Sequence, residues 1–110
     1  MLNHKSIFVM IIFTLILRKI IFFLTADPPS FKITPSDQIA KESEETVFLC
    51  TATGNPTPSI TWMKDGKTVV HGDTLRFSAN RSDSGKYWCL AENGLGLAIN
   101  TSVSLDVQCK

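Results

Sequence analysis

The sequence predicts an all-β fold, in which the chain after residue 26 forms two antiparallel sheets packed as a sandwich. Short segments with an apolar residue at every second position alternate with turn-forming clusters such as 54–58, the pattern of half-buried strands joined by tight turns. No helical period of useful length occurs after residue 27. Cys50 and Cys89 lie 39 positions apart with Trp62 between them, an order typical of two-sheet sandwiches.

The expected strands follow an extended segment at 27–30, because Pro28 and Pro29 fix their own backbone angles and restrict the residue before each of them. A hairpin turn is expected at 65–66, where Asp precedes Gly. The remaining expected elements are strands at 31–33, within 38–45, at 46–52, 60–64 and 68–70, one around Leu75 and Phe77, one through Tyr87, Cys89 and Ala91, and one through Val103, Leu105 and Val107.

Alternation along each strand assigns side chains to the inner or the outer face. An inward Cys50 brings Thr46 and Phe48 to the inner face as well. Thr46 is unexpected there, because a larger apolar residue would pack better. Trp62 and Tyr87 are also expected to point inward.

Residues 1–26 are interpreted as a secretory signal peptide or as an N-terminal signal anchor. Lys5 precedes an apolar run at 7–17, and a small residue ends the segment, which is the order of a cleavable signal. The alternative is an anchor spanning 7–24, which is short for a bilayer and is interrupted by cations at 18–19. Both interpretations place the following domain outside the cytoplasm.

The expected organisation is one domain at 27–108 and a C-terminal tail at 109–110. Of the 11 Lys and Arg residues three precede residue 27, whereas all 10 Asp and Glu residues lie at residue 27 or later. The part from residue 27 onward thus has 8 cations and 10 anions, a formal charge of −2. No basic stripe is present in this part of the sequence. The charge pattern therefore argues against nucleic acid as a partner.

Two longer segments resemble the intermediate (I-set) branch of the immunoglobulin superfamily. Segment 53–66 looks like the passage from strand B to strand C of such domains, and segment 83–93 looks like their strand F. The resemblance covers residues 28–108 and extends to modules of neural adhesion molecules, hemicentin-like matrix proteins and growth-factor receptor ectodomains. Its core signature consists of Trp62, Leu75, Asp83, Gly85 and Tyr87.

The resemblance implies a disulfide between Cys50 and Cys89 that bridges the two sheets. Trp62 would pack on the sulfur atoms, and Tyr87 would hydrogen-bond to the backbone at the corner before strand F. In the chain-entropy model such a link removes about 4 kcal/mol of unfolded-state freedom. Disulfides persist in oxidising compartments, which agrees with an extracellular domain.

The resemblance also implies binding rather than catalysis. The expected function is that of an extracellular protein-binding module in cell adhesion or cell-surface recognition, secreted or on the outer face of the plasma membrane. Its partner would be a protein of the cell surface or matrix, a second copy of the chain included. The alternatives are a soluble structural module of the extracellular matrix and an ectodomain fragment of a growth-factor or glycan receptor.

No enzyme chemistry is expected from this sequence. His4 and His71 lie far apart, and no cluster with metal-ligand spacing accompanies them. No catalytic residue, metal site, cofactor or small-molecule substrate is therefore expected. Contact with a membrane is expected only through a retained N-terminal segment.

A partner face is predicted at Met63, Trp88 and Leu90, which alternation places on the outer face of neighbouring strands. Met and aromatic residues are enriched at the cores of interfaces, and Trp is over-represented among the residues that dominate binding energy. The alternative is that Trp88 lies flat and covers its neighbours, as single exposed apolar residues often do.

Two acceptor sequences for N-glycosylation begin at Asn80 and Asn100, and a glycan at Asn100 would cover part of one sheet. Cys109 is predicted to be an unpaired thiol. Three interpretations of it stay open: a truncated chain, in which Cys109 occurs by chance or belongs to a further domain, a covalent dimer, and a capped thiol.

Overall fold

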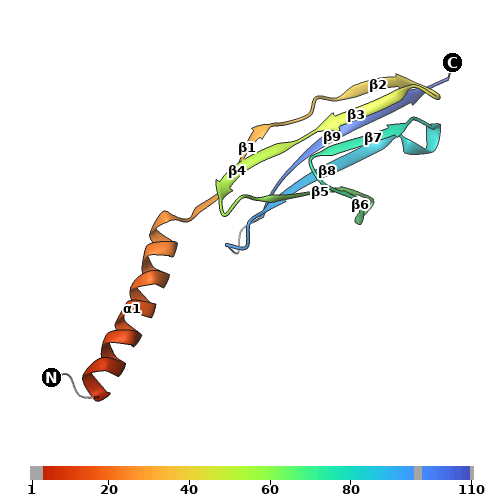
Figure 1. The fold of residues 1–110 in the computed structure, drawn as a ribbon. Coiled ribbons are helices and arrows are strands. Elements are labelled where there is room, and N and C mark those ends of the chain that lie inside the picture. Colours follow the sequence, from red (N-terminus) through yellow and green to blue (C-terminus); the bar gives the residue numbers. More distant parts are fainter. Residues whose placement is uncertain (1–3, 96–97, 110) are drawn as a thin grey trace.

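The computed structural model describes residues 4–95 and 98–109. Within them the helix precedes all the strands (Figure 1). The elements are α1 His4–Thr25, β1 Asp27–Ile33, β2 Gln38–Lys41, β3 Glu45–Leu49, β4 Thr51–Asn55, β5 Ser59–Lys64, β6 Lys67–His71, β7 Thr74–Ser78, the 3-10 turn η1 Arg81–Asp83, β8 Gly85–Glu92 and β9 Ile99–Gln108.

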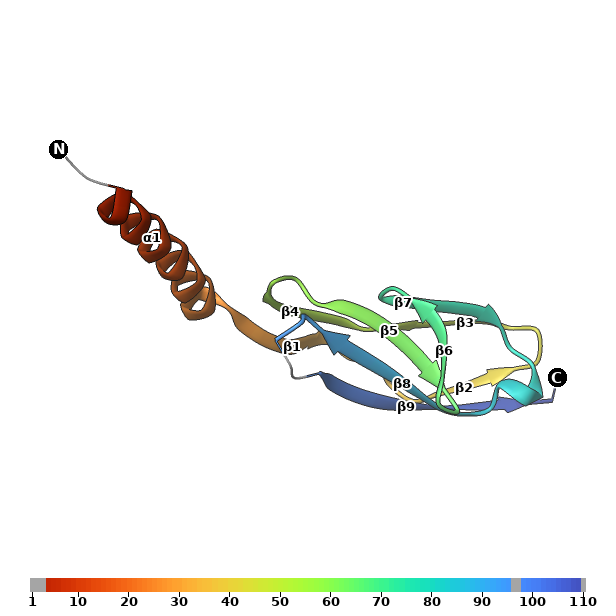
Figure 2. The same ribbon diagram turned by 90° about the horizontal axis from the view of Figure 1, so that it is seen from below.

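Helix α1 stands apart from the strands at one end of the molecule (Figures 1 and 2). Its 22 residues correspond to about 33 Å of helix. The large apolar side chains described between Ile7 and Leu17 are exposed. No helix among the described residues combines the length and the apolar character needed to cross a membrane.

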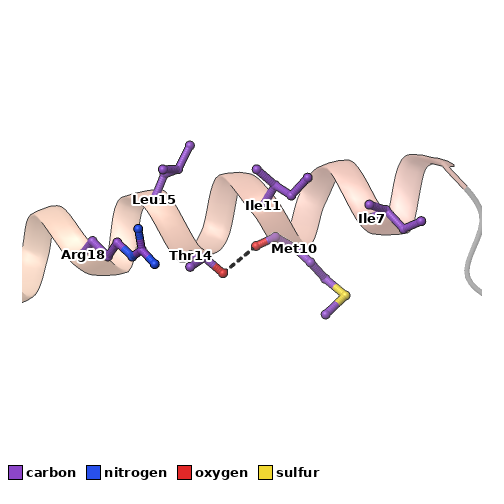
Figure 3. A pocket seen from close by; sticks show the side chains of 6 residues that line it. All are labelled: Ile7, Met10, Ile11, Thr14, Leu15 and Arg18. Atoms are coloured by element: carbon purple, nitrogen blue, oxygen red, sulfur yellow. Dashed lines mark hydrogen bonds between the residues drawn. The ribbon is translucent and has the colours of Figure 1, made fainter.

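A hollow of about 480 Å³ runs along α1. Figure 3 shows that its labelled lining side chains, among them Ile11, Leu15 and Arg18, all project from this one helix. Thr14 Oγ1 donates a hydrogen bond of 2.9 Å to the carbonyl of Met10, one turn earlier. Within the described chain no second element closes the hollow, so it offers no site that the fold has built.

The strands form the predicted sandwich. The larger sheet has the order β2-β9-β8-β5-β6, and the pairs β1-β4 and β3-β7 form the opposing layer. All neighbouring strands are antiparallel except β2 and β9, which run parallel. The long strands of the two layers run along the same direction (Figure 2).

The strand expected at 46–52 is two elements that meet at Cys50. β3 pairs with β7, whereas β4 pairs with β1. Each half of this segment thus hydrogen-bonds to a different strand. The alternation of the expected strand is nevertheless present, because Thr46, Phe48 and Cys50 are all buried.

Other boundaries also differ from the expected ones. β1 begins at Asp27 and contains both prolines, which an edge strand tolerates because it needs fewer backbone donors. The turn expected at 54–58 is shorter, since β4 continues to Asn55. The strand expected at 68–70 is longer, because β6 begins at Lys67 and ends at His71.

The core lies between the two layers. Phe48 and Trp62 are its largest fully buried side chains, and their ring centroids are 5.9 Å apart. Thr46 is 1% exposed, and its Oγ1 has no hydrogen-bond partner among the described residues. The other buried core residues are Ala40, Cys50, Leu75, Ala79, Tyr87, Cys89, Val103, Leu105 and Val107.

Candidate protein-binding face

The disulfide implied by the sequence is present and links β8 to the opposing layer. Cys50 and Cys89 are fully buried, with an S–S distance of 2.07 Å and Cα atoms 6.5 Å apart. Trp62 is also fully buried, and its Nε1 donates a hydrogen bond of 3.2 Å to the carbonyl of Asp73. Leu75 lies beside them in the core. This constellation ties the larger sheet to the opposing layer from the inside.

Tyr87 closes the core at the corner before β8. Its hydroxyl donates a hydrogen bond of 2.7 Å to the carbonyl of Asp83, and Lys64 Nζ lies 5.0 Å from the centroid of its ring. Burial, together with the negative charges of Asp83 and Asp65, raises the pKa of Tyr87 to about 12. The phenol is therefore neutral at physiological pH.

Asp83 and Gly85 belong to the predicted signature but lie at the corner rather than in the core. An Asp83 carboxylate oxygen accepts a 2.8 Å hydrogen bond from the Asn80 backbone N–H. Gly85 has a φ of 137°, a conformation that favours glycine. Between them, Ser84 Oγ accepts a hydrogen bond of 2.9 Å from the N–H of Val107. Ser84, a residue with no predicted role, thus ties the corner to β9.

The three residues of the predicted partner face lie side by side on the side of the larger sheet that points away from the core. Met63 of β5 pairs directly with Trp88 of β8, and Leu90 stands two residues further along β8. Trp88 is 40% exposed, while Met63 and Leu90 are half-buried. We call these three residues the outer face.

The outer face surrounds a shallow hollow of about 280 Å³. Gly66 of the β5–β6 turn and Asn100 of β9 complete its lining. Neither residue belongs to the predicted partner face. The hairpin signal at 65–66 and the sequence beginning at Asn100 were visible, but the pairing of β8 with β5 on one side and with β9 on the other is what places them at one hollow.

Lys86 provides a positive charge beside the outer face. Its Nζ lies 5.5 Å from the centroid of the Trp88 ring, within the range of a cation–π interaction. Glu92 is exposed at the other end of β8. An apolar centre between charged ends is the arrangement found in protein interfaces, which have an apolar core and a polar rim.

The remaining predicted site residues lie away from the hollow, except for Asn100. Asn80 is exposed immediately before η1, and Asn100 is exposed on β9. Cys109 is exposed after the end of β9, and no disulfide joins it to another cysteine of the described chain. Residues 4–95 and 98–109 contain no group of three or more His, Cys, Asp or Glu side chains arranged to hold a metal ion.

Asn93 has a structural role that sequence analysis did not assign. Its Nδ2 donates hydrogen bonds of 2.7 Å to the carbonyl of Asp27 and 3.2 Å to that of Pro56. These bonds join the end of β8 to the start of β1 and to the β4–β5 connection. A side chain at Gly54 would come within 3.1 Å of the same amide nitrogen, so a glycine suits the close approach.

Comparisons with known proteins agree with this architecture. A family model described as an immunoglobulin domain matches residues 28–93. The human netrin receptor DCC is 38% identical over 89 residues, which cover 73% of this chain and 6% of the receptor. A solved structure of Dpr11 IG1 bound to DIP-gamma superposes with a TM-score of 0.70 at 30% identity, covering 76% of this chain and 49% of the matched chain.

A further relative carries an enzyme's name. The human probable oxidoreductase PXDNL is 40% identical over 92 residues, which cover 76% of this chain and 6% of that protein. The chain thus spans a small fraction of both curated relatives. The similarity concerns one domain of each.

Proposed function

Because the chain belongs to the immunoglobulin domain family, we propose that it is an extracellular protein-binding module in cell adhesion or cell-surface recognition, which binds through the outer face. One observation carries the proposal: Trp88 is 40% exposed at the border of a hollow that half-buried Met63 and Leu90 also line. A large rigid side chain that is already partly ordered loses little conformational freedom on binding.

The proposed partner is another immunoglobulin-type domain, a second copy of this chain included. A structurally similar chain belongs to the solved complex of Dpr11 IG1 with DIP-gamma, which supports this class of partner. The proposed function of this chain is binding rather than catalysis. The oxidoreductase name of PXDNL belongs to a protein of which the match covers 6%.

A bead-aggregation assay tests the proposal and separates adhesion from a purely structural role in the matrix. Beads coated with the secreted chain, after enzymatic removal of its N-linked glycans, are mixed with beads carrying the same chain or members of a panel of cell-surface immunoglobulin ectodomains. We expect aggregation with at least one of them. Trp88→Ala should lower the affinity between the beads at least tenfold, because truncating a dominant interface residue to alanine costs about 2 kcal/mol or more of binding free energy.

The matched control is Leu49→Ala. Leu49 is 39% exposed on β3, on the opposing layer, against 40% for Trp88. The Leu49→Ala variant should leave aggregation unchanged. Equal losses for the two variants, or a loss for Trp88→Ala that follows a fall in melting temperature, would contradict a partner site at the outer face. The intact mass of the secreted chain would report at the same time whether residues 1–26 are removed.

A further inference from the structure

Asn100 stands beside the outer face because of the register between β8 and β9. Leu90 pairs with Asn100, and Trp88 pairs with Ser102. Directly opposite residues of an antiparallel pair share one face of the sheet, and diagonal neighbours such as Asn100 and Trp88 are about 7–8 Å apart, within reach of an aromatic side chain. Asn100 accordingly contributes to the lining of the hollow that Trp88 borders.

The same strand carries the acceptor sequence Asn100-Thr101-Ser102. Asn100 and Ser102 are both exposed, whereas Thr101 between them pairs with Cys89 and is half-buried. The amide that would carry a sugar and the hydroxyl that the acceptor sequence requires thus lie on the outer side of the sheet. A glycan attached there starts at the edge of the hollow.

We propose that an N-linked glycan on Asn100 lies across the hollow, covers Trp88 and closes the outer face to protein partners. In the attachment step the Asn100 Nδ2 forms a bond to C1 of the first sugar of a lipid-linked oligosaccharide diphosphate. The bond between C1 and the diphosphate oxygen breaks, the lipid diphosphate leaves with the electron pair, and one amide proton is lost to a base of the transferase.

Two contacts hold the first sugars over the hollow. One face of a pyranose ring carries C–H groups, which pack against the electron-rich face of an indole, and Met63 and Leu90 provide further apolar surface beneath. The effect of the glycan on partner binding rests on the proposed function. A glycoform that carries sugar at Asn100 has its partner face covered, whereas a glycoform without it has the face open.

The second acceptor site provides a matched control. Asn80 is exposed directly before η1, at the corner that precedes β8, and it does not line the hollow. A glycan there adds similar mass without covering Trp88. The two asparagines therefore separate an effect of location from an effect of glycosylation in general.

The test uses the full chain secreted from mammalian cells, as wild type, Asn100→Gln and Asn80→Gln. Intact mass measures occupancy, and acrylamide quenching of tryptophan fluorescence measures the exposure of Trp88, because the only other tryptophan, Trp62, is fully buried. A sugar that covers one of the two ring faces should lower the quenching constant about twofold. We expect the low value in wild type and Asn80→Gln, and the high value in Asn100→Gln.

If Asn100→Gln is not secreted, Ser102→Ala removes the same acceptor sequence, and enzymatic release of the glycan from folded wild type provides the open form. An unoccupied Asn100, or equal quenching with and without its glycan, would overturn the proposal whatever the bead assay shows. With the glycan in place, aggregation should be at least tenfold weaker than for Asn100→Gln. Equal aggregation by the two forms also overturns the closure, whereas quenching that behaves as expected without any aggregation points to a failure of the proposed function alone.

Discussion

Alternate residues of strand β8 lie in two different environments. Tyr87 and Cys89 point into the core, where they are 3% and 0% exposed, whereas Trp88 between them is 40% exposed on the outer side. The inner residues are held by the disulfide and the hydrogen bond to Asp83. The outer residue contacts Lys86 and borders a hollow. One strand thus combines a scaffold and the proposed recognition surface.

The difference indicates which substitutions each side tolerates. An inner side chain is surrounded by close-packed atoms, so any change of volume or polarity alters the free energy of unfolding. An outer side chain can change with little effect on stability and is free to determine a partner. The two tryptophans, one on each side of the larger sheet, allow this contrast to be measured with a single type of residue.

The largest expected effect separates Trp62→Ala from Trp88→Ala. Trp62→Ala should lower the free energy of unfolding by about 3–5 kcal/mol, since it leaves a large cavity and removes the donor to the Asp73 carbonyl. Trp88→Ala should change it by less than about 1 kcal/mol, as surface substitutions do. Urea unfolding of both variants provides the comparison. Similar losses for the two variants would mean that Trp88 is part of the core.

An intermediate effect is expected from the titration of Tyr87. Its pKa is raised to about 12 in the folded state, against about 10 in the unfolded chain. The stabilisation that belongs to the neutral phenol is therefore complete below pH 10 and is lost as the pH rises through 12, which amounts to about 2–3 kcal/mol. Urea unfolding measured between pH 8 and pH 12 should follow this fall.

Tyr87→Phe provides the control for that measurement. It should cost about 1 kcal/mol at pH 8, because the hydrogen bond to the Asp83 carbonyl is lost. Stability of this variant should then decrease less between pH 10 and pH 12 than that of the wild type. A parallel decrease would assign the alkaline loss to groups other than Tyr87.

The smallest expected effect comes from Thr46, whose Oγ1 is buried without a partner among the described residues. Thr46→Val has nearly the same shape and removes the unsatisfied hydroxyl, so it should raise the free energy of unfolding by about 1 kcal/mol. Thr46→Ser keeps the hydroxyl and removes a methyl group, so it should lower it by about 1 kcal/mol. Thermal and urea unfolding distinguish the two directions. A destabilised Thr46→Val would show that the hydroxyl is satisfied.

Much of the scaffold could be predicted because its signals are local. The two-residue period correctly placed Tyr87 and Cys89 inside and Trp88 outside. The Asp65-Gly66 signal marked a turn that does join β5 to β6, and both residues have positive φ. These features depend on residues that are close together in the sequence, so the sequence alone predicts them.

Other features depend on strands that are distant in the sequence. The break at Cys50 arises because β3 and β4 pair with different strands, and the parallel pairing of β2 with β9 has no local signal. The hollow beside Trp88 also required the register that brings Asn100 opposite Leu90. A shift of one residue would have turned Asn100 toward the core.

The sequence by itself determined the class of fold, the disulfide pair and the face of β8 on which each side chain lies, because alternation and signature spacing are properties of the unfolded chain as much as of the folded one. The tertiary structure decided which strands became neighbours. Pairing energy is gained between segments far apart in the chain, and only the folded sheet brings Asn100 to the surface that Met63, Trp88 and Leu90 form.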